Sequence, residues 1–327
     1  MKIAIVTPAP PRARNGNRVT AERWRRLLRQ LGHDVQIILP ENATKTGSLS
    51  STDLLIAVHA RKSHSAVASF HERFPDRPII VAIAGTDLSD DFARNGPRRD
   101  QVLASLEVAV RIIALHPLVE LELPLELRER VRVLLQSAVP LAHPPERTQR
   151  TLDMVVVGHL RAVKDPFLPA RALSQLPARS RLRIRHFGRA LDPDMLEEAR
   201  SAMERDPRYR WKGEQPRGEV RQAIARAHAL IHPSIAEGGA NTVSEALVLG
   251  TPVLATAIPG NLGLLGADHP GVFPVGDAAA LARLMLRFES EPRFRAILKE
   301  RCEAIGERHR PEAELGSWQK LLSEIGL

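Results

Sequence analysis

The sequence lacks the features that mark several classes of protein. Its single cysteine, Cys302, excludes an internal disulfide framework and a zinc site built from several cysteines. No window approaches the roughly 18 uninterrupted apolar residues of a membrane-spanning helix. The opening run MKIAIVTPAP is too short, and interrupted too soon by proline, to be the apolar core of a secretory signal. These absences predict a cytoplasmic protein without stable membrane insertion.

Lysine and aromatic residues are also scarce. The 327 residues include 47 basic and 38 acidic side chains, a formal charge of +9, but only seven of the basic residues are lysines. The arginines are scattered among acids, which is typical of GC-rich codon usage rather than of a nucleic-acid surface. Aromatic residues make up 4%, too few for base-stacking platforms. The composition therefore argues against nucleic-acid binding.

Several catalytic and cofactor motifs are missing. The chain has no G-x-x-x-x-G-K-[ST] loop, no G-x-G-x-x-G after its first apolar run, no G-x-S-x-G and no H-E-x-x-H. The twelve histidines show no metal-ligand spacing. We therefore expect no metal and no cofactor. Asp192-Pro193-Asp194 matches the metal-holding D-x-D pattern, but we interpret it as a proline turn that caps a helix at 194–205.

Short apolar runs alternate with segments of helical periodicity along the whole chain. Runs separated in this way by helices of ten or more residues favour β-α-β units and parallel sheets, so the fold class is α/β. The helix expected first is 18–31, followed by Gly32 at the position of a C-cap glycine. The expected strands are residues 2–7, 34–39, 53–58, 78–84, 110–115, 131–135, 153–157, 182–187, 228–232 and 252–256.

The alternation is interrupted at residues 137–151, which hold three prolines and little periodicity. The interruption predicts a linker between two domains, at 1–140 and 150–310. Ligands of parallel sheets bind at the carboxyl ends of the strands, so we expect both domains to face a central cleft. The last segment, 311–327, is expected to form a helix that returns to the first domain. No feature of the sequence indicates an oligomeric state.

The strongest functional signal is the segment 231–254, IHPSIAEGGANTVSEALVLGTPVL. An expected strand ends in a Pro-Ser turn, and Glu237, Gly238 and Gly239 then open a helix that contains Glu245. Glycines allow a ligand to approach the backbone closely, and the free N–H groups of a helix start favour a diphosphate. The two carboxylates are suited to accept hydrogen bonds from sugar and ribose hydroxyls. This segment therefore indicates a nucleotide-sugar site.

An E-x7-E pattern before a G-T-P-V strand resembles the retaining family-4 glycosyltransferases of the GT-B fold, and the resemblance extends over nearly the whole chain. It implies two Rossmann-like domains, the first binding the acceptor and the second binding the nucleotide sugar. It further implies that Glu237 contacts the donor sugar and that Glu245 holds the ribose. The backbone implied to contact sugar and phosphates comprises Gly238, Gly239, Ala240, Asn241, Thr242 and Val243.

A basic loop follows the strand expected at 153–157, in the stretch VVVGHLRAVKD. The resemblance implies that an arginine and a lysine of this loop bind the leaving diphosphate and supply positive charge as the anomeric bond breaks. Lys164 occupies the family's lysine position. The arginine position, directly after the glycine, holds His159, and Arg161 follows two residues later. Either Arg161 takes the role or His159 replaces it.

The first loop, residues 7–24, carries Gly16 where the family has a glycine pair against the donor diphosphate. Its polar residues suit a small phosphate-like acceptor better than a lipid or a sugar chain. The helix after it shows no exposed apolar face, so membrane docking is not favoured. The acceptor-binding candidates in this loop are Arg12, Asn15, Asn17 and Arg18, with Arg14 beside them.

The opening TPAPPRARNGNRVTAERW, together with VGHLRAVKDP, is similar to the selenosugar synthases of the selenoneine pathway. Those enzymes join selenophosphate to the sugar of UDP-N-acetylglucosamine or UDP-glucose and give a 1-selenosugar. The resemblance therefore implies a UDP-sugar donor and a small anionic acceptor, selenophosphate. An anionic selenium nucleophile needs orientation and charge compensation rather than a strong general base. The sequence offers no convincing base.

Four further candidates follow expected strands of the first domain. His59 and Lys62 come after 53–58 in the stretch AVHARKSH, and Thr86 follows 78–84. We expect these three to contact the acceptor, and His116, after 110–115, is a further candidate for the site. Two other functions stay open: an ordinary family-4 transferase with a saccharide or lipid acceptor, and a non-catalytic protein that binds nucleotide sugars.

Overall fold

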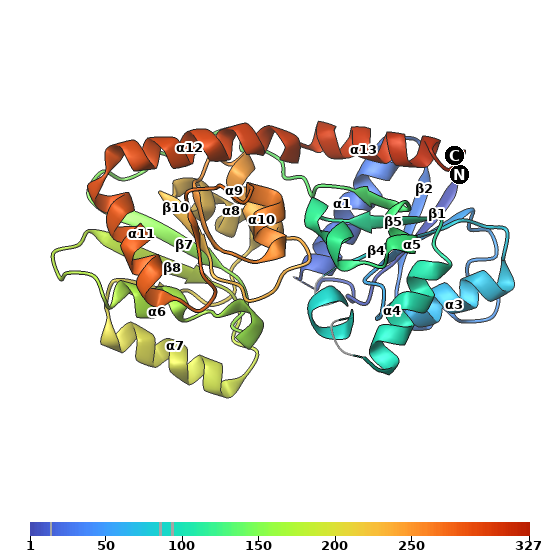
Figure 1. The fold of residues 1–327 in the computed structure, drawn as a ribbon, viewed down its shortest axis with the longest axis horizontal. Helices are drawn as coiled ribbons and strands as arrows, with labels where there is room; N and C mark the ends of the chain where they lie inside the picture. Colours follow the sequence, from blue (N-terminus) through green and yellow to red (C-terminus); the bar gives the residue numbers. More distant parts are fainter. Residues whose placement is uncertain (14, 85–86, 93–94) are drawn as a thin grey trace. The chain divides into compact units, whose positions relative to one another are not determined.

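A computed structural model describes residues 1–13, 15–84, 87–92 and 95–327. The chain forms two compact units (Figure 1). The first comprises Met1–Gln136, Glu237–Ala240 and Pro311–Leu327, and the second comprises Ser137–Ala236 and Asn241–Arg310. No helix in the described part of the chain is long and apolar enough to cross a membrane.

The first unit contains a sheet of six parallel strands in the order β2-β1-β3-β4-β5-β6. Its strands are nearly continuous apolar runs because helices cover both faces. Alternate residues of β1 point to opposite faces, with Ile3 and Ile5 in one buried cluster and Ala4 and Val6 in the other. The strands are β1 Lys2–Val6, β2 Asp34–Ile38, β3 Leu54–Val58, β4 Ile79–Ala82, β5 Arg111–Ala114 and β6 Val131–Val133.

Helices α1 and α13 pack on the Ile3 face of this sheet, and α3 and α4 pack on the Ala4 face. The helices of the first unit are α1 Gly16–Gln30, α2 Pro40–Ala43, α3 His64–Arg73, α4 Pro97–Glu107, α5 Leu125–Arg128 and α13 Pro311–Ser323. Short helical turns also occur at Asp87–Phe92 and Pro117–Glu122.

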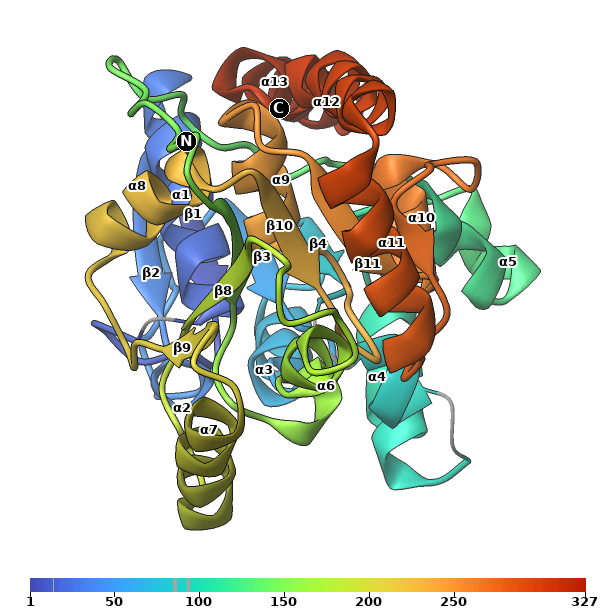
Figure 2. The ribbon, with the colours of Figure 1, turned by 90° about the vertical axis from the view of Figure 1, so that its left-hand side faces the viewer.

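The second unit repeats the architecture with six parallel strands in the order β12-β11-β10-β7-β8-β9. These strands are β7 Leu152–Val157, β8 Leu182–Phe187, β9 Tyr209–Trp211, β10 Ala229–His232, β11 Val253–Thr256 and β12 Val272–Phe273. The helices are α6 Leu168–Leu173, α7 Pro193–Arg205, α8 Arg217–Arg226, α9 Asn241–Val248, α10 Pro259–Leu265, α11 Ala278–Ser290 and α12 Pro292–Gly306. Helix α12 packs against α9 (Figure 2), and short turns occur at Ala162–Lys164 and Glu307–His309.

The expected α/β class is confirmed, and each of the ten expected strands is present with its ends within two residues of the expected ones. Two strands were missed, β9 and β12. Both lie at an edge of the second sheet and are only three and two residues long, too short for an apolar run to mark them. Asp192 caps α7 by accepting a hydrogen bond from the Asp194 N–H, as the turn interpretation predicted.

Helix α13 packs on α1, although the two are far apart in the sequence (Figure 1). The Glu314 carboxylate, 1% exposed, accepts two hydrogen bonds from Arg23 Nε, at 2.8 and 3.1 Å, and one from Trp24 Nε1 at 2.8 Å. Beside this cluster the rings of Trp24 and Trp318 meet edge to face with centroids 5.2 Å apart. Glu314 therefore supplies the charge that compensates the buried Arg23.

We expect Glu314→Ala to destabilise the first unit by about 3–5 kcal/mol, because it leaves the Arg23 charge buried without its carboxylate. Urea unfolding followed by tryptophan fluorescence measures this loss, since Trp24 and Trp318 both lie in the first unit. Glu312→Ala, at an exposed position of the same helix, is the control and should change stability by less than about 0.5 kcal/mol. Equal unfolding midpoints for the two variants would contradict the role assigned to Glu314.

Candidate functional site

In the second unit, β10 leads into the predicted nucleotide-sugar segment. His232, the last residue of β10, is buried, and its ring lies 3.3 Å from Ser234 Oγ through Nε2 and 3.4 Å from Thr242 Oγ1 through Nδ1. Because Thr242 is in the first turn of α9, this histidine links the end of the strand to the start of the helix. The start of α9 is therefore placed at the carboxyl edge of the sheet, where ligands of parallel sheets bind.

Glu245 is buried in α9, and its Oε1 accepts a 2.8 Å hydrogen bond from Arg217 Nη2. Arg217 is the first residue of α8, and its side chain is 59% exposed. The pair places one cation beside the carboxylate expected to hold the ribose. The sequence did not single out Arg217. The signal that points to Arg217 is its position in the sequence. It begins the helix that precedes the strand and its Pro-Ser turn.

The basic loop after β7 is joined directly to the turn after β10. The Ile235 N–H donates to the Val163 carbonyl at 2.9 Å. Val163 lies in the helical turn Ala162–Lys164, and Ile235 lies two residues before Glu237. The hydrogen bond brings together two segments that the sequence predicted to act on one ligand.

Within the basic loop, His159 and Arg161 have different surroundings. His159 Nδ1 accepts a 3.1 Å hydrogen bond from the Arg189 N–H, so this ring nitrogen is used to hold the backbone of a neighbouring loop. Arg161 is exposed and directly precedes the turn that carries Lys164. Asp165 closes the turn in a left-handed conformation, φ 38°, and accepts from Arg171 Nη2 at 2.8 Å. These contacts favour Arg161 over His159 as a ligand for an anion.

In the first unit, the loop after β1 ends at the start of α1. Asn15 caps α1 by accepting from the Arg18 N–H at 3.1 Å. The Arg18 guanidinium pairs with Glu22 on the next turn of the helix. Arg12 is exposed in a left-handed conformation, φ 67°. Gly16 is the first residue of α1, Asn17 is half-buried beside it, and Arg14 lies outside the described residues.

His59 directly follows β3, which pairs with β1, so both strand ends lie at the same edge of the first sheet. Its side chain is buried, and Nδ1 lies 2.6 Å from a carboxylate oxygen of Asp87. Lys62, three residues on, is exposed. Thr86 lies outside the described residues. Asp87 was not predicted to take part, although the acid-rich run DLSDD shortly after a strand is a signal that sequence reading can detect.

His116 follows β5 and is also buried, and within the described part of the chain its Nδ1 has no hydrogen-bond partner. Burial lowers the pKa of His116 to about 4. Its ring is therefore neutral at pH 7 and can take part in hydrogen bonds there without adding charge.

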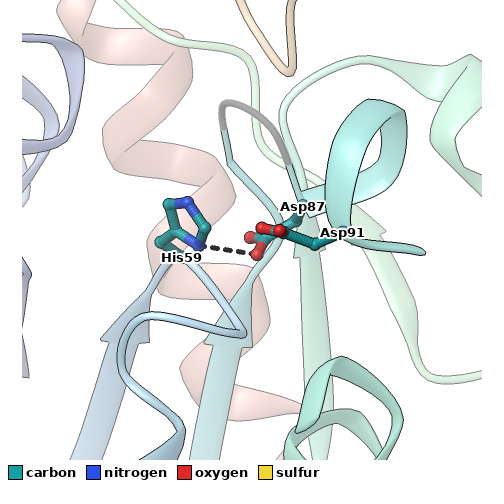
Figure 3. A group of neighbouring side chains, drawn as sticks. All are labelled: His59, Asp87 and Asp91. Carbon is teal, nitrogen blue, oxygen red and sulfur yellow. Dashed lines mark ion pairs between the residues drawn. The ribbon is translucent and has the colours of Figure 1, made fainter. Parts of the chain in front are cut away.

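One cluster among the described residues has the composition of a metal site. His59, Asp87 and Asp91 are all buried and bring one ring nitrogen and two carboxylate oxygens within 4.8 Å of one another (Figure 3). Arg61 already occupies the neighbourhood of Asp91, with Nε 2.7 Å from its carboxylate. The positive charge beside these carboxylates is therefore supplied by the chain itself.

Comparison with known proteins identifies the family. The model of the family described as glycosyl transferases group 1 matches residues 144–308, just over half of the chain. The chain belongs to the group 1 glycosyltransferases. The matched region contains the basic loop after β7, the turn after β10 and all of α9.

This group 1 glycosyltransferase is similar to a curated relative, the glycosyltransferase 1 domain-containing protein 1 of Xenopus tropicalis, with 28% identity over 174 residues. That match spans 52% of this chain and 50% of the relative, so the chain covers about half the length of that protein. The relative's activity as a whole protein therefore does not transfer directly to this chain.

Solved structures show the same fold over the whole chain. Anabaena HepE, determined with UDP, matches with a TM-score of 0.76 and 15% identity, covering 99% of this chain and 100% of that one. Sucrose-phosphate synthase from Thermosynechococcus elongatus has a TM-score of 0.77 at 14% identity, covering 99% and 98%. A glycosyltransferase from Rickettsia africae has a TM-score of 0.78 at 14% identity, with the same coverage. At these identities the similarity establishes the GT-B-like fold alone.

Gly239 is one of several glycines of this group 1 glycosyltransferase that a close contact requires. A Cβ added there would lie 2.6 Å from Leu115 Cβ and 2.8 Å from Leu115 Cδ1, distances that real Cβ atoms do not adopt. The segment Glu237–Ala240 belongs to the first unit, as Leu115 does. A side chain at this position would displace the loop that carries Glu237.

We therefore expect Gly239→Ala to lower the stability of the protein by about 1–3 kcal/mol, because the new methyl group overpacks against Leu115. Thermal unfolding measures the change. Gly218→Ala in α8 is the control, since no atom lies within 4 Å of the added Cβ and the backbone there has an ordinary φ. That variant should be neutral or more stable, by up to about 1 kcal/mol. A Gly239→Ala protein that melts like the control would contradict the close contact.

Proposed function

We propose that this protein transfers a sugar from a UDP-sugar, UDP-N-acetylglucosamine or UDP-glucose, to the selenium of selenophosphate and thereby makes a 1-selenosugar. The observation that carries the donor side is the hydrogen bond from Ile235 to Val163, which holds the Lys164 loop beside the turn that leads to Glu237. Similar structures of Anabaena HepE hold UDP and UDP-glucose, which supports a UDP-linked donor. Membership of the group 1 family supports glycosyl transfer.

In the proposed donor complex the diphosphate lies at the start of α9, near Arg161 and Lys164. Helix N–H groups and these two cations supply the positive charge that the leaving UDP requires. The backbone from Gly238 to Val243 follows the sugar and the phosphates. Because the helix N–H groups and the two cations supply this positive charge, the proposed transfer requires no metal ion and no cofactor.

The two glutamates take separate parts in the proposal. Glu237 accepts hydrogen bonds from the donor sugar, and Glu245 accepts them from the ribose. Arg217 engages Oε1 of Glu245, so the ribose hydroxyls bind at the other carboxylate oxygen or displace the exposed guanidinium. Because Arg217 is largely exposed, its displacement costs little.

On the acceptor side, the proposal places selenophosphate at the carboxyl edge of the first sheet, near Arg12, Asn17 and His59. Asn15 caps α1 by accepting from the Arg18 N–H, and the Arg18 guanidinium pairs with Glu22 of the same helix. We therefore propose Arg12 as the arginine of this loop that binds the acceptor phosphate. The selenium identity of the acceptor is supported by the similarity of the loops at 7–24 and 157–166 to selenosugar synthases. The same proposal assigns binding of the acceptor to the first unit and binding of the donor to the second unit.

The deciding experiment is mass spectrometry of the purified protein with UDP-N-acetylglucosamine, with and without selenophosphate, under anaerobic reducing conditions. We expect UDP release coupled to a selenium isotope pattern on a hexosamine mass. Absence of that product, with UDP-glucose tried as well, would withdraw the selenium proposal. Transfer to a saccharide or lipid acceptor instead would identify an ordinary family-4 enzyme, and UDP-sugar binding without turnover would identify a binding protein.

We expect Glu237→Ala and Glu245→Ala to separate the two glutamate roles. Glu237→Ala should lower turnover about 100-fold or more but leave the Kd for UDP within about twofold, because UDP lacks the donor sugar that Glu237 is proposed to bind. Glu245→Ala should weaken UDP binding itself about 10- to 100-fold, through loss of hydrogen bonds to a buried carboxylate. Isothermal titration with UDP and turnover with UDP-sugar are the measurements.

The control for both variants is Glu219→Ala, an exposed acid in the first turn of α8. It should leave UDP binding and turnover unchanged. If Glu237→Ala retained full turnover, or if Glu245→Ala bound UDP as tightly as the control, the assignment of the donor site would be wrong.

A further inference from the structure

We propose that His59 is the proton acceptor of this enzyme and that Asp87 positions it. The inference rests on the proposed function, since it assigns a step to the acceptor site of the same transferase. His59 would take the proton that the acceptor carries as its nucleophile attacks the sugar. The sequence offers no convincing base, whereas the structure brings a histidine and an aspartate together at a strand end of the first sheet.

The hydrogen bonds of Asp87 fix the tautomer of His59. Both residues are fully buried, and the Asp87 carboxylate accepts backbone N–H groups from Ala60 at 2.8 Å, Ala84 at 3.1 Å and Arg61 at 3.1 Å. His59 Nδ1, at 2.6 Å, is its fourth neighbour. A carboxylate has about four lone-pair sites, and these four groups use all of them. The 2.6 Å contact with a carboxylate oxygen requires a hydrogen on Nδ1, and the Lys62 N–H, 3.5 Å from the same nitrogen, is too far away to compete with it. In the neutral ring Nε2 therefore holds the free lone pair.

Nε2 is the atom that the fold leaves without a partner. It is buried and has no hydrogen-bond partner within the described part of the chain. In Figure 3, Nδ1 faces Asp87 and the other ring nitrogen points away from both carboxylates. A buried polar atom without a partner destabilises the folded state, so a purely structural role would not favour histidine here. A ligand bound at the strand end would supply the missing partner.

The backbone at His59 supports the same conclusion. Its φ of 75° lies in the left-handed region, which asparagine and glycine adopt more readily than histidine. Strained residues at the ends of strands are a recurring feature of functional sites. The strain is maintained by the turn around it, in which the Ser63 N–H donates to the His59 carbonyl at 3.0 Å and Ser63 Oγ donates to the Val58 carbonyl at 2.8 Å.

A metal ion fits the cluster less well than a proton does. The lone pairs of Asp87 are already used, and Nδ1 of His59 is turned to Asp87. Asp91 is paired with Arg61 at 2.7 Å, and Arg98 Nη1 lies 3.9 Å from its other oxygen. Nε2, which would be left for a metal, points away from both carboxylates. Both carboxylates are therefore already engaged within the chain, and Nε2 of His59 is left facing away from them.

An imidazole is only a moderately strong base, which suits an acceptor that needs no strong one. In the proposed step, hydrogen selenophosphate gives its one proton to Nε2. The selenium electron pair forms the bond to C1 of the sugar, and the C1–O bond to the diphosphate breaks with its electrons on UDP. The phosphoryl group stays on selenium until water hydrolyses the Se–P bond, which releases inorganic phosphate and the 1-selenosugar. The proton on the imidazolium then passes to water. A hydroxyl acceptor would follow the same path, with the O–H proton passing to Nε2.

The test uses His59→Asn. Asparagine tolerates the left-handed backbone, and its amide can donate to Asp87, but it cannot accept a proton at neutral pH. We expect the variant to stay folded and to bind UDP within about twofold, with turnover lowered about 100- to 10,000-fold. His71→Asn, at an exposed position of α3, is the matched control and should keep full turnover. If His59→Asn turned over like the control, the inference would fall while the proposed function stood.

A second measurement does not depend on turnover. Nitrogen-15 spectra of the histidine rings, with the His59 signals assigned by their loss in His59→Asn, report which ring nitrogen carries the hydrogen. We expect hydrogen on Nδ1, an unprotonated Nε2, and a change at Nε2 when inorganic phosphate or selenophosphate is added. Hydrogen on Nε2, or no response to either anion, would overturn the inference even if the wild-type protein made selenosugar. An Nε2 response in a protein that made no selenosugar would support the base and withdraw selenium as the nucleophile.

Discussion

The hydrogen bond from the Ile235 N–H to the Val163 carbonyl is the constraint on which the proposed donor site depends. It joins the loop after β7 to the turn after β10, two segments that come from neighbouring strands of one sheet. The loop that carries Lys164 is thereby tied to the turn that precedes Glu237 in the sequence. A backbone hydrogen bond fixes this relation whatever side chains occupy the loops. Both loops can therefore vary in sequence, as His159 at the family's arginine position illustrates.

Each unit also uses carboxylates to hold the site in place. Asp87 accepts three backbone N–H groups and orients a histidine, Glu314 neutralises a buried arginine on α1, and Glu245 is paired with Arg217. Asp87 and Glu314 thereby fix elements that carry candidate ligands, whereas the exposed guanidinium of Arg217 leaves Glu245 available to a ligand. A chain with a formal charge of +9 therefore uses several of its acids inside, and the excess of arginine remains largely outside. This division is consistent with an enzyme whose proposed substrates are both anions.

Much of the fold and part of the site could be predicted from the sequence. Buried parallel strands are apolar runs, so β1, β3 and β10 were recognisable, whereas β9 and β12 are too short to give a pattern. Glu237 and Glu245 could be found because their spacing is local. Asp87 and Arg217 could not be assigned, because their roles depend on partners 28 residues away in each case, His59 and Glu245. Which hydrogen bonds a buried group makes is a property of packing, and sequence spacing does not contain it.

The return of α13 to the first unit has a consequence for how the chain folds during synthesis. The ribosome synthesises residues 311–323 after the whole of the second unit, yet Trp318 and Glu314 complete the packing around Trp24 and Arg23 of α1. Until that helix emerges, one face of the first sheet and of α1 remains uncovered. The second unit needs no segment from outside residues 137–310 to close its core. Domains generally fold N-terminal first during synthesis, but here the first unit cannot complete its packing until residues 311–323 have been translated.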